Sequence, residues 1–264
     1  MNINLVYFSA THTTKNVVSM ITGHLEGADD KINKFDITQV VFNEDVICDA
    51  DSLLVVGVPV YAGRIPAKVA KMLNKFKGND TPAVIICVYG NRDYDDALLE
   101  LKDIVEANGF RIISAGAFIA QHSIFPKVGE GRPDERDNET IKSFAAKTAE
   151  RYSVFTAKFP QTAKIQDIAI KGNRPYKAPG NVPLKPKGNK NCNSCFTCVK
   201  RCPVNAIDEQ SPRKTNKKIC ISCGRCIVDC PQKARSFEGL LYKFAGKLFV
   251  KANSVRKEPE VFFV

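Results

Sequence analysis

Eight of the ten cysteines of this 264-residue chain lie between residues 192 and 230, where one pattern occurs twice. The first run is Cys192-x2-Cys195-x2-Cys198-x3-Cys202-Pro203, and the second is Cys220-x2-Cys223-x2-Cys226-x3-Cys230-Pro231. In both runs an alanine follows the last cysteine by four residues, at Ala206 and Ala234. A run that is stated twice with the same internal spacing predicts a small module with two pseudo-symmetric halves.

This spacing predicts two [4Fe–4S] clusters. A Cys-x2-Cys-x2-Cys loop turns three thiolates toward one cluster, and the fourth ligand comes from the other run. The predicted ligands are Cys192, Cys195, Cys198 and Cys230 for the first cluster, and Cys220, Cys223, Cys226 and Cys202 for the second. Zinc ribbons also use Cys-x2-Cys pairs, but they lack the x3-Cys-Pro ending. We expect the small residues Ser194 and Gly224 to let backbone amides approach the sulfurs.

The other two cysteines and the distribution of apolar residues limit the classes of protein to which this chain can belong. Cys87 lies inside the apolar run AVIICVY and is predicted to be core, and Cys48 has no partner motif. No apolar run approaches the roughly 20 residues that span a bilayer. The start of the chain lacks the basic segment and cleavage site of a signal peptide. We therefore expect a cytoplasmic protein without a membrane span, and its clustered cysteines argue against a disulfide scaffold.

Charge is divided unevenly along the chain. Residues 1–160 hold 18 Lys and Arg against 21 Asp and Glu, whereas residues 161–264 hold 21 against 7. We interpret the basic part as a solubilising surface around anionic clusters, which would also attract an acidic redox partner. The sequence contains no helix-turn-helix or similar motif, so it does not favour binding to nucleic acid.

The first 160 residues alternate between strands and helices. Apolar strands are predicted at 3–8, 53–58, 83–89 and 112–118, with a weaker one at 32–37. Helical periodicity is predicted over 65–76, 98–105 and 141–155, and Gly109 is placed to end the second of these helices. Such alternation predicts an α/β domain with a doubly wound parallel sheet, for which we expect five strands in the order 2-1-3-4-5.

After this domain, which we place at residues 1–160, the chain changes character. Residues 161–190 are rich in Pro, Gly, Asn and Lys and predict an irregular linker. Residues 191–236 carry the cysteine module, a small α+β domain. Residues 237–264 are predicted to hold an amphipathic helix and a tail. On that helix Leu240, Leu241, Phe244 and Leu248 oppose three lysines, and we expect it to dock on its own protein rather than on a membrane.

Three loops at carboxyl ends of the predicted strands point to a nucleotide. The first strand runs into Ser9-Ala-Thr11-His12-Thr13-Thr14, whose hydroxyls and helix N-terminus suit a phosphate. The other two loops are Pro59-Val60-Tyr61-Ala62-Gly63 and Tyr89-Gly90-Asn91-Arg92-Asp93-Tyr94. Their glycines admit close backbone approach and their tyrosines can stack on a flat ring. This combination predicts flavin mononucleotide (FMN); a dinucleotide is not favoured, because G-x-G-x-x-G is absent.

Residues 1–160 resemble flavodoxin, and the whole chain is similar to fused flavodoxin–ferredoxin proteins of anaerobes. The resemblance rests on FSATHTTKN, GVPVYAGRIP, YGNRDYDDAL and the two cysteine runs. It implies that Ser9, Thr11, Thr13 and Thr14 hold the phosphate, that Tyr61 and Tyr94 flank the ring, and that Gly90 and Asn91 meet its polar edge. His12 stands where the family's phosphate loop has glycine. His tolerates positive φ, and when protonated it would add to phosphate binding.

These features favour an electron-transfer protein that couples two [4Fe–4S] clusters to FMN. Two alternatives stay open. One is an enzyme, a flavin-dependent reductase of a small or macrocyclic substrate that is fed by ferredoxin electrons. The other is a regulatory protein that senses oxygen through its clusters, with an empty flavodoxin shell.

Overall fold

The computed structural model describes residues 1–25, 27, 30–158, 167–180 and 182–264. Its central sheet has six strands in the order β10-β7-β6-β4-β1-β2. The strands are β1 (Asn2–Tyr7), β2 (Lys31–Asp36), β4 (Ser52–Pro59), β6 (Thr81–Tyr89), β7 (Phe110–Ile119) and β10 (Glu260–Phe263). The five strands before β10 pair in parallel, in the predicted order, and each lies within two residues of its predicted bounds.

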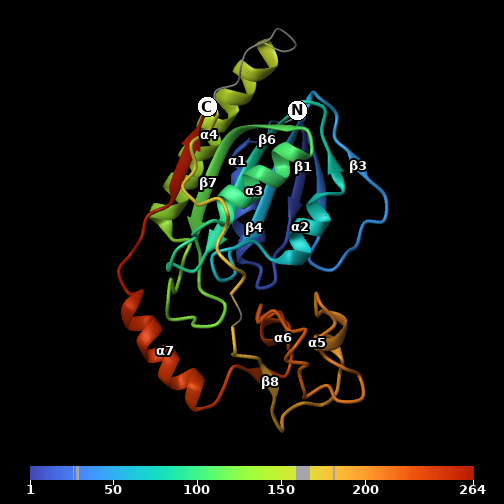
Figure 1. Cartoon of the computed structure of the whole chain (residues 1–264), viewed down its shortest axis with the longest axis vertical. Coiled ribbons are helices and arrows are strands. Elements are labelled where there is room, and N and C mark those ends of the chain that lie inside the picture. The colour runs from blue at the N-terminus through green and yellow to red at the C-terminus, as the bar shows by residue number, and fades with distance from the viewer. Residues whose placement is uncertain (26, 28–29, 159–166, 181) are drawn as a thin grey trace.

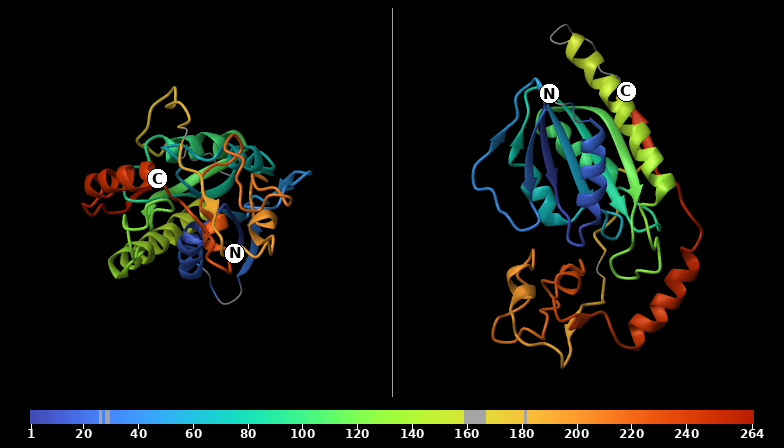
Figure 2. Two further views of the ribbon diagram at one scale, coloured as in Figure 1. Left: turned by 90° about the horizontal axis from the view of Figure 1, so that it is seen from below. Right: turned by 180° about the vertical axis from the view of Figure 1, so that it is seen from behind.

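Helices cover both faces of the sheet, as doubly wound topology requires (Figures 1 and 2). On one face α1 (Thr13–Leu25) and α4 (Glu135–Lys158) share an apolar core with β1 and β4. On the other face lie α2 (Ala67–Leu73) and α3 (Ala97–Ala107). The strands β4 and β6 are almost wholly buried, which explains their continuous apolar runs. A separate two-stranded sheet joins β3 (Val46–Ile47) to β5 (Phe76–Lys77).

The sheet has six strands rather than the five that we predicted from the sequence. The extra strand is β10, at the C-terminal end of the chain, which pairs antiparallel with β7 so that Phe262 lies opposite Ala115. Val261 and Phe263 pack on the core that α1 and α4 cover. The last residues of the chain therefore complete the first domain, and a purely local reading of residues 237–264 as helix and tail missed this return.

Residues 167–180 run over the surface of the first domain without regular structure. The backbone N–H groups of Asn173 and Lys177 donate to the Asp96 carboxylate at 2.9 and 2.7 Å, and Arg174 forms an ion pair with Asp103. This part of the predicted linker is therefore fastened to the domain that precedes it. The predicted boundary at residues 160 and 161 lies outside the described residues.

The cysteine module is built from two short helices and two short strands. These are α5 (Thr197–Lys200), α6 (Arg225–Val228), β8 (Lys187–Gly188) and β9 (Arg235–Ser236), and the two strands pair antiparallel. Both α5 and α6 begin two residues after the second cysteine of their run. The structure thus repeats with the sequence, and the module has two related halves.

The cysteine module lies at the carboxyl ends of the parallel strands, below the first domain in Figure 1. From the module the chain enters α7 (Leu240–Ala252), which runs along the side of the molecule and leads back to β10. None of the helices in the described part of the chain combines the length and apolar character that a bilayer crossing requires.

Candidate functional site

The loop from β1 to α1 places hydroxyl groups at the carboxyl edge of the sheet. Ser9 is buried, and its Oγ accepts a hydrogen bond from the N–H of Lys15 at 3.0 Å. The N–H of Ser9 donates to Thr38 Oγ1 at 2.8 Å. These bonds hold the turn that opens α1. Three of the four predicted hydroxyl residues then line a hollow at this helix N-terminus: Thr11, Thr13 and Thr14.

His12 adopts the backbone conformation that glycine would favour. Its φ is 67°, within the left-handed region that histidine tolerates better than most residues. Its Nε2 lies 3.1 Å from Oδ1 of Asp229, in the cysteine module. The residues that line the hydroxyl hollow do not include it. The structure therefore brings His12 to the cysteine module and not to the predicted phosphate position.

A cavity of about 450 Å³ adjoins the hydroxyl hollow. The two spaces share the walls formed by Val60, Tyr61, Tyr89, Gly90, His122 and Ser123. The loops after β4 and β6 both contribute, as predicted from the sequence: Pro59 borders the hollow, and Ala62, Gly63 and Arg92 border the cavity. A polar hollow at a helix N-terminus that continues into a larger cavity fits a phosphate joined to a flat ring.

Close packing and burial constrain two residues that line this cavity, Gly90 and Tyr61. A Cβ on Gly90 would lie 2.5 Å from the ring of His122, so only glycine fits beside that imidazole. Burial raises the pKa of Tyr61 well above its ordinary value, and the nearby Cys223 thiol raises it further. The Tyr61 hydroxyl therefore stays protonated at neutral pH. The side chain offers a flat ring face and a hydroxyl that can donate a hydrogen bond.

The structure places two predicted ring contacts elsewhere. Tyr94 is fully buried, its hydroxyl donates to Glu260 at 2.6 Å, and the Lys171 ammonium lies 4.1 Å from its ring centroid. Asn91 is buried as well, and its amide donates to the carbonyls of residues 253 and 255 at 2.9 and 2.8 Å. Neither lines the hollow or the cavity. Both fasten the returning C-terminal segment.

Several cavity residues were missed in the sequence because they come from distant segments. They are His122, Ser123, Ile124 and Phe125 after β7, Lys177, Gly180, Val182 and Pro183 before the cysteine module, Ile221 and Ser222 within it, and Phe249 of α7. Of these only His122 could have been expected from the sequence, because it lies in a loop that follows a predicted strand, as do the loops after β4 and β6. Its Nδ1 accepts hydrogen bonds from the N–H groups of Ile124 and Phe125, each at 3.1 Å.

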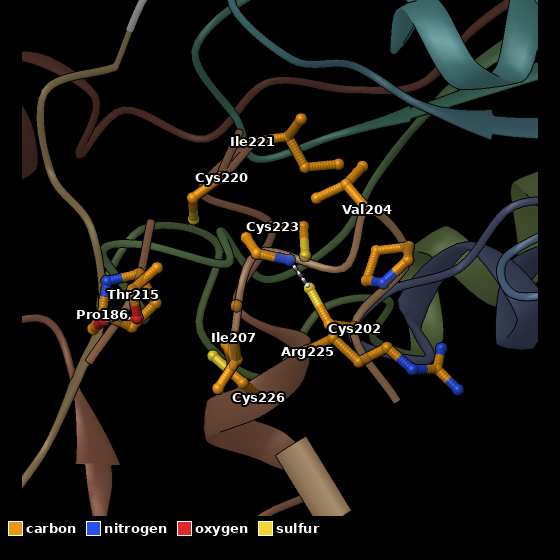
Figure 3. A pocket seen from close by; sticks show the side chains of 13 residues that line it. Pro186, Cys202, Val204, Ile207, Thr215, Cys220, Ile221, Cys223, Arg225 and Cys226 are labelled. Carbon is orange, nitrogen blue, oxygen red and sulfur yellow. Dashed lines mark hydrogen bonds between the residues drawn. The ribbon is translucent and has the colours of Figure 1, made fainter. Parts of the chain in front are cut away.

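The eight module cysteines divide into the two predicted sets. Cys192, Cys195, Cys198 and Cys230 line one hollow. Cys202, Cys220, Cys223 and Cys226 line another, and Figure 3 shows their sulfurs around it. Among the described residues, no group of three or more His, Cys, Asp and Glu side chains is placed to hold one metal ion. Each set of cysteines thus borders a hollow and does not meet at one point.

The backbone around each hollow is arranged in the same way. Positive φ angles recur at equivalent positions of the two runs: Ser194 and Ser222, Phe196 and Gly224, Asn205 and Lys233. Backbone N–H groups point at sulfur, because Ala206 donates to Cys202 at 3.2 Å and Ala234 to Cys230 at 3.3 Å. N–H donors stabilise a thiolate or a bound iron–sulfur group. The donor set and the amides therefore fit the two clusters expected from the sequence.

A buried arginine lies between the two cysteine hollows. Arg235 Nη1 is 4.0 Å from the sulfur of Cys198, which belongs to the first set. Its guanidinium also lowers the pKa of Cys226, from the second set, although burial raises that pKa overall to about 11. A second nitrogen, Nη2, donates to the carbonyl of Pro186 at 3.2 Å. Nε has no hydrogen-bond partner within the described residues. The equivalent position in the first half is the buried Ile207.

The module is joined to the first domain by polar contacts at the carboxyl edge of the sheet. Arg225 is buried, and its Nη1 donates to the carbonyl of Ser9 at 3.0 Å. Gln39 donates to the carbonyl of Lys200 at 2.7 Å, and Lys68 donates to that of Pro203 at 3.0 Å. These bonds seat the second set of cysteines against the hydroxyl loop.

The other two cysteines lie in the first domain, away from both hollows. Cys87 is fully buried in β6, and Cys48 is buried beside the small sheet. Burial raises the pKa of the Cys48 thiol to about 11 and that of Cys87 further. Both therefore stay protonated at neutral pH, which agrees with the packing role predicted for Cys87.

No protein-family model matches the chain, and no curated protein matches it significantly. Solved structures with a similar fold include an archaeal flavodoxin, at 14% identity and a TM-score of 0.42, which covers 58% of this chain and 99% of its own. Flavodoxin 2 from Bacillus cereus has 14% identity and a TM-score of 0.43, with coverages of 57% and 99%. The apo form of an NADH:FMN oxidoreductase has 15% identity and a TM-score of 0.39, with coverages of 55% and 89%.

Proposed function

We propose that this chain is an electron-transfer protein that holds two [4Fe–4S] clusters and one FMN. In this proposal the hydroxyls of Thr11, Thr13 and Thr14 hold the FMN phosphate, and the cavity behind Tyr61 and Gly90 holds its ring. Each cysteine hollow holds one cluster. When bound, the clusters exchange single electrons, and the flavin exchanges one or two.

The observation that carries the proposal is that the second cysteine hollow and the flavin-sized cavity share a wall. Ile221 lines both spaces, and its neighbours in the sequence belong one to each: Cys220 to the hollow and Ser222 to the cavity. Gly224 packs on the same junction, because a Cβ there would lie 3.3 Å from the carbonyl oxygen of Ser123. Ile221 therefore belongs to the walls of both spaces, which places the second cysteine hollow next to the cavity.

The exposure of the first cysteine hollow supports an outward-facing role. Cys195 is exposed and Phe196 is 36% exposed, whereas Cys223 is buried against the first domain. Residues 161–264 carry 21 Lys and Arg against 7 Asp and Glu. This arrangement favours an acidic redox partner that contacts the module near Cys195.

The position of His12 bears on the alternative of an empty flavodoxin shell. An empty shell would be expected if the His12 side chain filled the phosphate position. His12 adopts positive φ and directs its ring to Asp229, so the hollow beside the three threonines stays free of its side chain. This supports a flavin-binding first domain in preference to a sensor with an empty shell.

The test is cofactor content followed by flavin reduction. Protein purified without oxygen is expected to carry about eight irons and one flavin. Cys195→Ser and Cys223→Ser should each lose a cluster, and flavin reduction by a reduced low-potential donor protein should slow in both. Cys48→Ser is the matched control and should change neither.

Three results separate the candidate functions. Flavin reduction that is unchanged in both cysteine variants would overturn the relay. Iron without flavin, even after FMN is added, would favour the sensor. Substrate-dependent reoxidation of the flavin in a screen of small and macrocyclic compounds would favour the reductase.

A further inference from the structure

Helix α7 has two apolar faces, and only one of them is used within the molecule. On the inner face the ring of Tyr242 stacks on Phe125 with centroids 5.4 Å apart, and Phe249 lies 5.0 Å from the same ring. The Tyr242 hydroxyl donates to the carbonyl of Ile124 at 3.1 Å. Gly246 admits the Phe125 ring, because a Cβ there would lie 3.2 Å from it. The inner face is therefore closely packed on the loop after β7.

The outer face is the one that we expected from the sequence to dock on the protein itself; this expectation was wrong, because the face is exposed. It carries Leu240, Leu241, Phe244 and Leu248, which are 86%, 57%, 68% and 57% exposed. They follow one another at helical spacing and form a single stripe along α7, the helix that runs along the side of the molecule in Figure 1. Isolated exposed apolar residues are ordinary, but a contiguous stripe of four large ones marks an interaction surface.

Positive charge accompanies this stripe. Lys243, Lys247 and Lys251 recur every four residues, so they form one row along the helix beside the apolar stripe, and all three are exposed. Residues 240–257 contain no Asp or Glu. A partner for this face must therefore be apolar along one line and anionic beside it.

We propose that the outer face of α7 docks on an anionic lipid surface. Its leucines and phenylalanine enter the boundary between headgroups and acyl chains, and its lysines extend to the headgroups. A second copy of this chain fits less well, because residues 240–257 of a facing α7 contain no Asp or Glu to pair with the lysine row. This proposal uses no cofactor and stands apart from the proposed function.

The test is co-sedimentation of the full-length protein with lipid vesicles. We expect binding to vesicles of phosphatidylcholine mixed with phosphatidylglycerol, and binding at least roughly tenfold weaker to phosphatidylcholine alone. The double variant Leu241→Gln/Phe244→Gln and the double variant Lys243→Gln/Lys247→Gln should each weaken binding by roughly tenfold or more. Added salt should weaken wild-type binding.

A matched control is Val41→Gln, because Val41 is 60% exposed on a loop of the first domain. It should bind anionic vesicles as the wild type does. All substituted side chains are exposed, and unchanged circular dichroism spectra check that each variant is folded. Failure of the wild type to bind anionic vesicles, or equal binding by the Leu241/Phe244 variant, would overturn the proposal. Sedimentation that shows a dimer dissociated by Phe244→Gln would assign the face to a second copy instead.

Discussion

The side chain of His122 makes three contacts beside the cavity. Its ring lies against Gly90, it stacks on Phe125, and its Nδ1 accepts two backbone hydrogen bonds. Burial, with a smaller effect of the Arg92 charge, lowers the pKa of His122 to about 4. The imidazole is therefore neutral at pH 7, with Nδ1 as the acceptor.

This pKa predicts a pH dependence of stability. In the unfolded chain His122 becomes protonated below its ordinary pKa of about 6.5. In the folded chain the imidazole stays neutral down to about pH 4. Between these values the unfolded state binds more protons, so stability falls as pH falls. At pH 5 the cost is about 2 kcal/mol. Urea unfolding at pH 7 and pH 5 should show this loss in the wild type and a smaller one in His122→Gln. Equal losses would contradict the assigned environment.

Arg235 is the second residue whose role can be measured. It places a permanent positive charge between the two cysteine hollows, beside Cys198. A nearby cation stabilises a reduced, more negative cluster. Arg235→Met should therefore disfavour reduction by about tenfold or more, which is about 59 mV for one electron. Arg235→Lys should recover part of the shift. Redox titration followed by electron paramagnetic resonance checks this, with iron content as the measure of intact clusters. Unchanged potentials in the Met variant would exclude this role.

Local pattern predicted some residues well and others poorly. The cysteines that line each hollow are grouped as the spacing led us to expect, three from one run and the fourth from the other. Thr11 lines the hydroxyl hollow and Tyr61 lines both the hollow and the cavity, in loops that follow parallel strands. Tyr94 was predicted to flank a ring, but its hydroxyl binds Glu260, which lies 166 residues away in the sequence. A side chain that is occupied by a distant partner gives no local sign of it.

At the scale of elements, the C-terminal segment shows the largest departure from the sequence pattern. β10 has only four residues, and the alternation of strands and helices had already ended at α4. Its place was fixed by partners spread over the first domain: Asn91, Tyr94, and Arg132, which donates to the carbonyl of Lys257 at 2.7 Å. The buried parallel strands were predictable because each is a continuous apolar run, whereas an edge strand of this length depends on tertiary contacts.

Asn91 tests how this segment is held. Its side chain donates to Asn253 and Val255 and accepts from the N–H of Lys257 at 3.1 Å. Asn91→Ala should remove about 2–4 kcal/mol, at about 0.5–1.5 kcal/mol for each bond. Urea unfolding measures this loss, and limited proteolysis should show faster cleavage between α7 and β10. Asn16→Ala, on an exposed turn of α1, is the control and should not loosen that segment. Unaltered cleavage in Asn91→Ala would mean that β10 pairing alone holds the chain.

At the scale of the whole molecule, the chain leaves the first domain, forms the cysteine module and returns to the sheet through α7. The module is therefore attached to the domain at both of its ends, by residues 167–180 and 182–186 and by α7 with β10. The sequence predicted an irregular linker before the module, either flexible or laid over the surface. The structure lays residues 167–180 over the first domain and fastens them to Asp96 and Asp103.

The interface between the module and the first domain predicts the effect of loosening the module. Gln39 and Lys68 bind module carbonyls from the first domain, and neither lines a hollow or the cavity. In the proposed function, Gln39→Ala/Lys68→Met should therefore keep iron and flavin, yet slow flavin reduction through the module, because the rate of electron transfer falls as two redox sites move apart. Anaerobic stopped-flow absorbance measures the rate. Lys75→Met, which removes an exposed lysine paired with Asp45, is the matched control. If both variants reduce flavin at the wild-type rate, the contacts at the sheet edge do not set the coupling between the modules.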